Sequence, residues 1–267
     1  MFPVYHKNIM LYKQYIDSFL YIGEFILMGH VIISKYTTLT PLQFIGESAG
    51  YCWGSNTKDP EVNIKRAIDC IACMHGRTME FPNISLVLVG YSARVIREWY
   101  THRGGDPTRL QSSTRYVDAQ TFGYVTPHTI EANPEAKKVY DETIESIRAG
   151  YAKLEELGIK REDAAMVLPL GMETVIVDKR NFRNLVDMSR QRMCTRAYWE
   201  YRELFNDIIN ALSTYSGEWN TLIKMCMKPK CEELGYCPEK KGCGRKPSRE
   251  EFNKIVEAGK EALKKSK

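Results

Sequence analysis

The densest group of residues that could do chemistry lies at positions 101–116, in the sequence THRGGDPTRLQSSTRY. His102, Arg103, Arg109 and Arg115 are interspersed there with two adjacent glycines and several hydroxyl residues. Guanidinium groups and hydroxyls donate hydrogen bonds to phosphate oxygens, and glycines let the backbone approach a ligand closely. The stretch therefore predicts an anion-binding loop. A basic, polar surface turn explains the same residues about equally well.

A second group of donors falls within residues 181–212, most of which show helical periodicity. Arg192 and Arg196 are four residues apart and Ser189 comes three before Arg192, so in one continuous helix they share a face. Like charges at that spacing repel each other, and a bound anion would relieve the repulsion. Glu200, four residues beyond Arg196, would relieve it as an ordinary salt bridge, and this simpler interpretation is favoured.

The third group is a set of cysteines near the C-terminus. Cys226, Cys231, Cys237 and Cys243 are the right number of thiols for a tetrahedral zinc ion. Their C-x4-C-x5-C-x5-C spacing lacks the usual C-x2-C pairs. Structural zinc, reduced thiols in a mobile tail and a redox disulfide therefore remain as alternatives.

The positive charge of the chain is concentrated in the same region. The formal net charge is +5, and residues 224–267 contain 13 Lys and Arg against seven Asp and Glu, which leaves the preceding residues slightly negative. A protein built mainly to bind nucleic acid carries its basic surface across the fold itself. Nucleic-acid binding through a zinc-containing tail is therefore a minor alternative for the main function, and nucleic acid is not an expected partner.

Hydrophobic periodicity predicts the elements that position these groups. Helical spacing is found in residues 61–75 and 134–157, and a β-branched run of strand length occupies residues 84–89. Residues 167–181 indicate a helix end, a Pro-Gly turn and a short strand, and Gly158 is expected to end the longer helix. The residues of that helix expected to face inward are Val139, Ile144, Ile147, Tyr151 and Leu154.

Length and composition indicate one large domain with an appendage, since the chain has 267 residues and 43% apolar content. No secretory signal pattern precedes the eight cysteines, so the expected location is the reducing cytoplasm. Glu24 and His30 interrupt the apolar stretch FLYIGEFILMGHVIISKY, which predicts a buried helix followed by a strand rather than a membrane span. The expected divisions are an N-terminal extension at 1–27, a catalytic domain at 28–225 and a basic, Cys-containing tail at 226–267.

Several of these segments resemble the flavin-dependent thymidylate synthase family. The signature of that family is Arg-His-Arg, a spacer, and a serine shortly before Arg-Tyr, which corresponds here to residues 101–103 (THR) and 113–116 (STRY). Residues 75–80 (HGRTME) resemble a His/Thr/Glu turn that lies against the flavin in the family. VLPL at 167–170, followed by Asn181-x-Arg183 and Arg192, is similar to the family's C-terminal block. The resemblance spans roughly residues 30 to 225.

The resemblance implies a fold and an activity. The fold is expected to be a single α+β domain, in which a central, largely antiparallel sheet is flanked by long helices. The implied reaction is reductive methylation of dUMP to dTMP, with 5,10-methylenetetrahydrofolate as carbon donor and with FAD, reduced by NADPH, as hydride donor. The family also implies a homotetramer whose active sites are shared between subunits.

The resemblance also implies roles for individual residues. Arg192 is expected to be catalytic, because it would bind the pyrimidine and stabilise the negative charge that develops on it. The other residues expected to bind the nucleotide substrate are Glu98, Arg109, Gln111, Ser112, Ser113, Thr114 and Arg115. The residues expected to bind the flavin are His75, Thr78, Glu80, His102, Arg103, Asn181, Arg183 and Asp187.

Several positions depart from the family pattern. Thr101 replaces the first arginine of the signature, and Ala165 aligns with an arginine that helps to hold the nucleotide. Gln111 aligns with a glutamate, and Arg109 is a candidate to replace a lost guanidinium. These departures leave open a relative that binds flavin and nucleotide but uses another pyrimidine or has lost the synthase activity.

Overall fold

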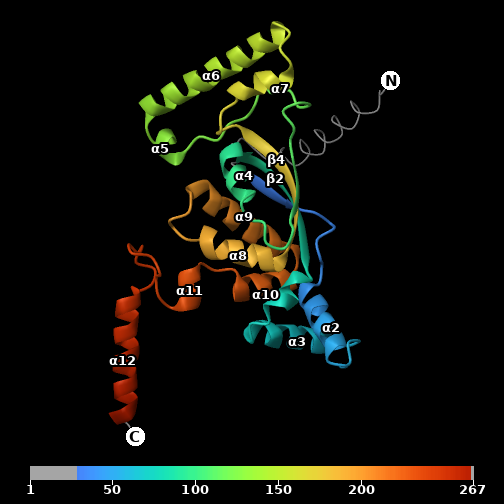
Figure 1. The fold of residues 1–267 in the computed structure, drawn as a ribbon, viewed down its shortest axis with the longest axis vertical. Helices are drawn as coiled ribbons and strands as arrows, with labels where there is room; N and C mark the ends of the chain where they lie inside the picture. The colour runs from blue at the N-terminus through green and yellow to red at the C-terminus, as the bar shows by residue number, and fades with distance from the viewer. Residues whose placement is uncertain (1–28, 266–267) are drawn as a thin grey trace.

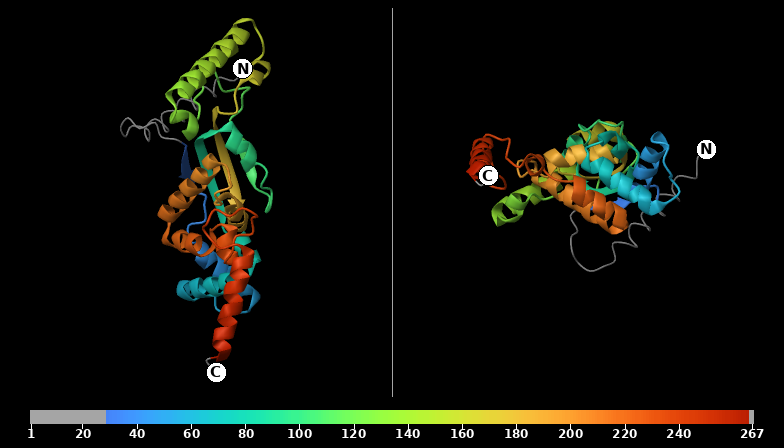
Figure 2. Two further views of the ribbon diagram at one scale, coloured as in Figure 1. Left: turned by 90° about the vertical axis from the view of Figure 1, so that its left-hand side faces the viewer. Right: turned by 90° about the horizontal axis from the view of Figure 1, so that it is seen from below.

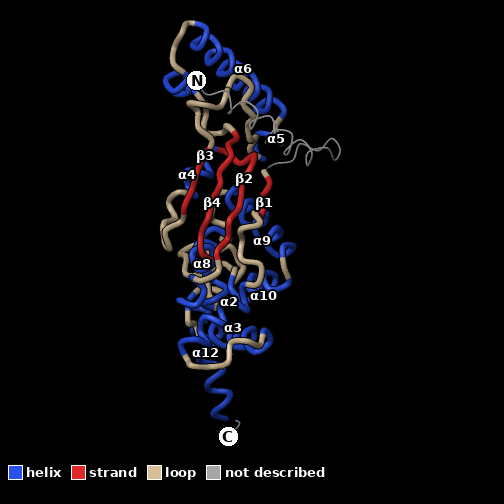
Figure 3. The backbone as a smooth tube through the Cα atoms, turned by 90° about the vertical axis from the view of Figure 1, so that its right-hand side faces the viewer, coloured by secondary structure: helices blue, strands red, loops and turns tan. Residues whose placement is uncertain are grey.

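The centre of the fold is a four-stranded antiparallel sheet with the strand order β1-β2-β4-β3 (Figure 3). The computed structural model describes residues 29–265, so the expected extension at 1–27, with its buried helix, lies outside the described residues. The strands are β1 (His30–Ile33), β2 (Asn83–Ser92), β3 (Thr108–Gln111) and β4 (Glu173–Asn181). The predicted strands at 84–89 and at the end of 167–181 are confirmed as β2 and β4.

One face of the sheet is covered by helices. Ile84, Leu86 and Leu88 alternate along β2 and are fully buried, as the period of two in a strand requires. They belong to one core with the buried faces of α8 (Phe182–Arg192), α9 (Trp199–Tyr215) and α10 (Gly217–Cys226), which lie together on one side of the sheet (Figure 1). The expected α+β class with an antiparallel sheet is confirmed.

The opposite face of the sheet carries a row of apolar side chains that no helix of the described residues covers. Ile32, Val87, Val177 and Leu110 are paired in register across the four strands, so they lie on the same face. Ile32, Val177 and Leu110 are 39%, 42% and 72% exposed. Apolar residues on a sheet face that no helix covers are typical of a surface that packs against another protein.

The remaining helices extend the molecule beyond both ends of the sheet (Figures 1 and 2). The helices beyond one end are α5 (His128–Glu131), α6 (Pro134–Glu156), α7 (Arg161–Ala164) and the short η2 (Ala165–Val167). The elements toward the other end are α2 (Pro41–Cys52), α3 (Pro60–Ala72), η1 (Gly76–Glu80), α11 (Lys230–Leu234) and α12 (Arg249–Lys265). Among the described residues, no helix combines the length and apolar character needed to cross a membrane.

The long helix predicted from periodicity is α6. The Asn133 side chain caps its first turn by accepting from the backbone N–H groups of residues 135 and 136, and Gly158 follows the helix with φ of 79°. Ile144 and Tyr151 are buried as predicted. The prediction that Val139 faces inward is wrong, because this residue is 63% exposed.

The predicted helix over most of 181–212 is interrupted at residues 193–198, and this corrects one prediction. Arg192 ends α8 and Arg196 lies in the connecting loop, so the two arginines do not share a helix face. A continuous helix of 32 residues would be about 48 Å long, longer than the roughly 33 Å of a ten-residue strand. The break lets α8 and α9 both pack on the sheet. Glu200 does not offset the repulsion between the two arginines. It is buried and accepts hydrogen bonds from the backbone N–H and the hydroxyl of Ser92.

A buried ion pair joins β4 to the helices. Arg180 Nε and Nη2 each donate to one carboxylate oxygen of Asp178 at 2.6 Å, and both side chains are fully buried. The Trp99 indole donates to Asp178 at 2.8 Å, and its ring lies under the Arg180 guanidinium. Arg180 also donates to Asn184 in α8. The network therefore connects β4 with α8 and with α4 (Ala93–Trp99).

This network predicts a large stability effect. Asp178→Ala leaves the Arg180 charge buried without its partner, so we expect the free energy of unfolding to fall by about 3–5 kcal/mol. The measurement is urea denaturation at a fixed protein concentration. Lys179→Ala, at the exposed neighbouring position, serves as the control and should change the value by less than about 0.5 kcal/mol. A comparable small effect for both variants would contradict the role given to the pair.

Candidate functional site

Arg192, the predicted catalytic residue, is fixed at the end of α8 by two other predicted site residues. Its Nη1 donates to Glu98 Oε2 at 3.0 Å, and its Nε donates to His102 Nε2 at 3.0 Å. The guanidinium also lies 4.5 Å from the centre of the Tyr201 ring. The Arg192 side chain keeps 21% of its surface exposed and lines a cavity of about 510 Å³, so it is accessible to a ligand.

His102 must be neutral to accept the hydrogen bond from Arg192. Burial lowers the pKa of His102 to about 4, and the charges of Arg192, Arg180 and Arg109 act in the same direction. The imidazole is therefore uncharged at neutral pH, with its proton on Nδ1 and a lone pair on Nε2. Three guanidinium groups thus lie near one neutral ring, which leaves a local excess of positive charge.

The residues predicted from the His/Thr/Glu turn meet the start of α8. Arg183 Nη1 pairs with Glu80 Oε1 at 2.6 Å, and both side chains are 44% exposed. The Thr78 hydroxyl donates to the backbone oxygen of His75 at 2.8 Å, which closes the turn of η1. The structure therefore brings four of the predicted flavin residues together between η1 and α8.

The turn after His102 packs against the same end of α8. Asn181 caps the helix by accepting from the Asn184 backbone N–H at 2.9 Å. A Cβ at Gly105 would stand 2.3 Å from the Asn181 side-chain nitrogen, and Gly105 has φ of 73°, so only glycine suits this position. Arg103 in this turn is exposed. Asp187 lies apart from this group and forms an ion pair with Arg190.

The predicted phosphate-binding stretch lines a separate cavity of about 270 Å³. Gln111 and the hydroxyl residues 112–114 form one wall, but the cavity is lined by two acidic residues, Asp118 and Glu173, and by no lysine or arginine of the described chain. Burial raises the pKa of Glu173. Arg115 points elsewhere, to an ion pair with Glu162 at 2.9 Å. The stretch is also partly a strand, β3, rather than the expected loop.

Arg109, the candidate replacement guanidinium, lies on the covered face of β3. It donates to the backbone oxygen of Trp99 at 3.4 Å and stacks over the Tyr100 ring. It is therefore close to the Arg192 group and does not line the cavity of residues 111–114.

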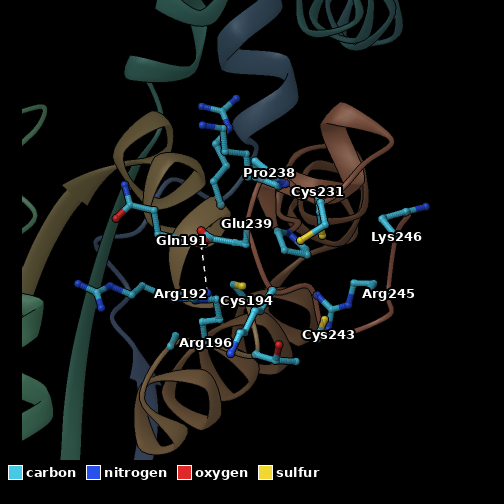
Figure 4. Close-up of a pocket in the computed structure, with 17 residues that line it drawn as sticks. Gln191, Arg192, Cys194, Arg196, Cys231, Pro238, Glu239, Cys243, Arg245 and Lys246 are labelled. Atoms are coloured by element: carbon cyan, nitrogen blue, oxygen red, sulfur yellow. Dashed lines mark ion pairs between the residues drawn. The ribbon is translucent and has the colours of Figure 1, made fainter. Parts of the chain in front are cut away.

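The four tail cysteines predicted as zinc ligands are not brought together. Cys226 is only 7% exposed and belongs to the main core. Cys231, Cys237 and Cys243 line a different cavity together with Cys194, outside the core (Figure 4). The part of the chain that the structure describes contains no preassembled group of three or more His, Cys, Asp or Glu side chains that could hold a metal ion.

Sequence reasoning missed several residues around the site. In β4, Asp178 and Arg180 follow Ile176 at intervals of two residues, so all three side chains point to the covered face. This period in the sequence was a signal that the two charges are buried. Tyr201 had no comparable signal. Its ring lies under Arg192, and its buried hydroxyl has no hydrogen-bond partner among the described residues.

The low pKa of His102 predicts a pH dependence of stability. The ordinary pKa of 6.5 applies to the unfolded chain and about 4 to the native state, so between these pH values only the unfolded chain binds the proton. The stabilising effect of the neutral ring is complete above pH 6.5 and is lost as the pH falls toward 4. The free energy of unfolding should therefore fall more steeply over this range in the wild type than in His102→Gln. Urea denaturation at several pH values measures both slopes, and equal slopes would contradict the assignment.

Comparisons with known proteins identify the family of this chain. Residues 35–215 match the family model described as thymidylate synthase complementing protein. The flavin-dependent thymidylate synthase of Nitratidesulfovibrio vulgaris is 32% identical over 66% of this chain and 74% of its own length, and that of Pyrococcus horikoshii is 30% identical over 74% and 83%. The fold is shared with the Helicobacter pylori enzyme solved with FAD and dUMP, with a TM-score of 0.60 and 22% identity over 74% of this chain and all of that one. The chain therefore belongs to the flavin-dependent thymidylate synthase family.

Proposed function

We propose that this protein converts dUMP to dTMP by reductive methylation, with 5,10-methylenetetrahydrofolate as carbon donor and NADPH as the source of reducing equivalents. The observation that carries the proposal is the arrangement of Arg192, Glu98 and His102 in a chain of this family. Because Arg192 is held from two sides and is partly exposed, it is preorganised to meet a ligand. All eight cysteines are free, in keeping with the reducing cytoplasm that we propose as the location.

Arg192 would bind the uracil ring and stabilise the negative charge that develops on it. A guanidinium stays protonated at any physiological pH, so its charge is constant during the reaction. The hydrogen bond to neutral His102 and the ion pair with Glu98 hold its orientation. No enzyme nucleophile is needed in this role, and the Ser113 side-chain oxygen accepts a hydrogen bond from the Arg115 backbone N–H.

The donors between η1, the turn at 102–105 and the start of α8 fit FAD. Arg183 and Arg103 are exposed cations suited to a pyrophosphate, and the glycines of the turn allow close approach of the backbone. His75, Thr78, Glu80 and Asn181 add polar groups beside them. When bound there, FAD reduced by NADPH supplies the hydride. The role of the protein is to hold the cofactor near Arg192. His102 links the two, because it belongs to the turn at 102–105 and accepts a hydrogen bond from Arg192.

The cavity of residues 111–114 is an incomplete phosphate site in one chain. Hydroxyl and amide donors suit phosphate oxygens, but a dianion between Asp118 and Glu173 also requires cations, which the described part of the cavity lining lacks. A second copy of the chain would supply the missing guanidinium groups. This charge deficit supports active sites shared between subunits.

The uncovered row on the sheet supports the same conclusion. Ile32, Val87, Val177 and Leu110 form a continuous apolar surface that self-association would bury. We therefore propose a homotetramer in which sheet faces meet.

An activity assay tests the proposed reaction. Protein loaded with FAD is incubated without oxygen with NADPH, methylenetetrahydrofolate and dUMP, and dTMP is detected by chromatography. We expect dTMP from the wild type and a loss of about 10²–10³-fold in kcat/KM for Arg192→Ala, because it removes a preorganised charge. Arg249→Ala is the matched control, since Arg249 in α12 also stacks on a tyrosine, Tyr236, and should keep its activity.

The assay separates the synthase from its relatives. Flavin reduction by the wild type without formation of dTMP would contradict the proposal. It would indicate another pyrimidine nucleotide as substrate, which a screen of such nucleotides would identify. Equal activity of Arg192→Ala and wild type would remove the role assigned to this arginine.

The oligomer has its own test. Val177→Lys places a charge in the middle of the apolar row, so the assembly should dissociate to smaller species and lose dTMP formation. Val62→Lys on α3 is the matched control, because Val62 is 41% exposed and Val177 is 42% exposed. Light scattering after size-exclusion chromatography measures the mass. An unchanged tetramer for Val177→Lys would show that subunits meet elsewhere.

A further inference from the structure

A second cavity, of about 510 Å³, lies between the end of α8 and the tail. Four of the eight cysteines line it: Cys194 from the loop after α8, Cys231 from α11, and Cys237 and Cys243 from the tail loop (Figure 4). These thiols come from three separate segments of the chain. Their presence around one cavity is a result of the fold and does not follow from the spacing of the tail cysteines.

The segment that contains two of these cysteines has no core of its own. None of the residues 235–248 is buried, and apart from a single bridge between Cys237 and Ser248 the segment has no regular secondary structure. Its turns rely on Gly235 and Gly244, which have φ of 76° and 86°. A compact loop without an apolar core needs another source of stability, and in small protein segments this is commonly a metal or a disulfide.

The position of Gly242 indicates that this loop is built around Cys237. A Cβ at Gly242 would stand 3.4 Å from Cys237 Sγ, so the chain passes directly beside the sulfur. The Cys237 backbone N–H donates to Pro247 O at 2.7 Å, which joins the two ends of the loop. Cys237 and Cys243 both line the cavity.

Charge around the cavity is complementary to a metal bound by thiolates. A zinc ion with four thiolate ligands carries a net charge of −2. The cations that line the cavity are Arg190, Arg192, Arg196, Lys230, Lys241, Arg245 and Lys246. Of the described residues that line it, Glu239 alone carries a carboxylate, which pairs with Arg196 at 3.3 Å.

We propose that Cys194, Cys231, Cys237 and Cys243 bind one structural Zn²⁺ ion, with Cys194 in place of the Cys226 expected from spacing. Cys226 lies in the main core and does not line the cavity. The four thiols are not preassembled, so binding the metal draws the tail loop toward Cys194, as metal binding coupled to local folding does. The ion would then link the tail to the loop that follows Arg192.

The metal content of the full-length protein tests the proposal independently of any enzyme activity. Protein purified with a reductant and without chelators should contain about one zinc ion per chain, measured by mass spectrometry of the metal. Cys194→Ser and Cys243→Ser should each lose the ion, because changes even in the outer shell of a metal site cost about 10–100-fold in affinity. Neither residue is buried, so both variants should fold.

Two matched controls make the ligand set specific. Cys226→Ser and Cys73→Ser, the latter exposed like Cys243, should keep their zinc. Co²⁺ substitution should give the strong visible absorption of a tetrahedral thiolate site in the wild type and in both controls. Loss of zinc from Cys226→Ser with retention in Cys194→Ser would overturn the proposed set. The proposed metal binding would be contradicted by wild-type protein that contains no zinc and takes up none. It would also be contradicted by disulfides between these cysteines in a thiol titration without reductant.

Discussion

The candidate site depends on the buried pair of Asp178 and Arg180. A buried ion pair is costly to form and is maintained only when both charges are fully hydrogen-bonded. Here Trp99 donates to Asp178, and Arg180 donates to Asn184 and Met188. Trp99 is the last residue of α4, directly after Glu98, and Asn184 lies in the first turn of α8. The network therefore sets the distance between the two helices that carry the residues around Arg192.

The same network contributes to the electrostatics of the site. The charge of Arg180 adds to those of Arg109 and Arg192 in lowering the pKa of His102, after burial. A neutral His102 accepts a hydrogen bond from Arg192 without competing with it for an anion. Among the described residues, Glu98 is the carboxylate that pairs with Arg192. An electron-rich ligand that reached Arg192, as we propose, would therefore be stabilised by its charge.

Elements that bury one face were predictable from the sequence, because burial imposes a period of two or 3.6 on the apolar residues. This holds for β2, α3 and α6. The strand β3 was not predictable, since Thr108–Gln111 contains one apolar residue, Leu110, and that residue faces away from the core. It becomes a strand because the edge of β4 pairs with it. The break between α8 and α9 also has no local signal, since residues 193–198 contain neither glycine nor proline.

The candidate site was predictable as a set of residues but not as a set of contacts. The motifs placed Arg192, His102 and Glu98 among the functional residues, and the structure brings these three together. The hydroxyl residues 112–114 and the predicted zinc ligands are arranged by long-range packing instead. Cys226 was assigned to the metal because it is near the other thiols in sequence, whereas α10 carries it into the core. Cys194 is distant in sequence and reaches the tail only because the helix breaks after Arg192.

That break also determines how firmly the tail is attached. The contacts between the tail and the end of α8 include ion pairs of Arg190 with Glu233 and of Arg196 with Glu239, and a hydrogen bond from Arg245 to the Met193 backbone oxygen. Exposed ion pairs contribute only about 0–1 kcal/mol each, which is too little to order a loop that has no core. Bonds from a metal to Cys194 and to the tail would act two residues from Arg192. The guanidinium would then be positioned from one side by Glu98 and His102 and from the other by the tail, which gives the tail a mechanical reason to be joined to the domain that carries Arg192.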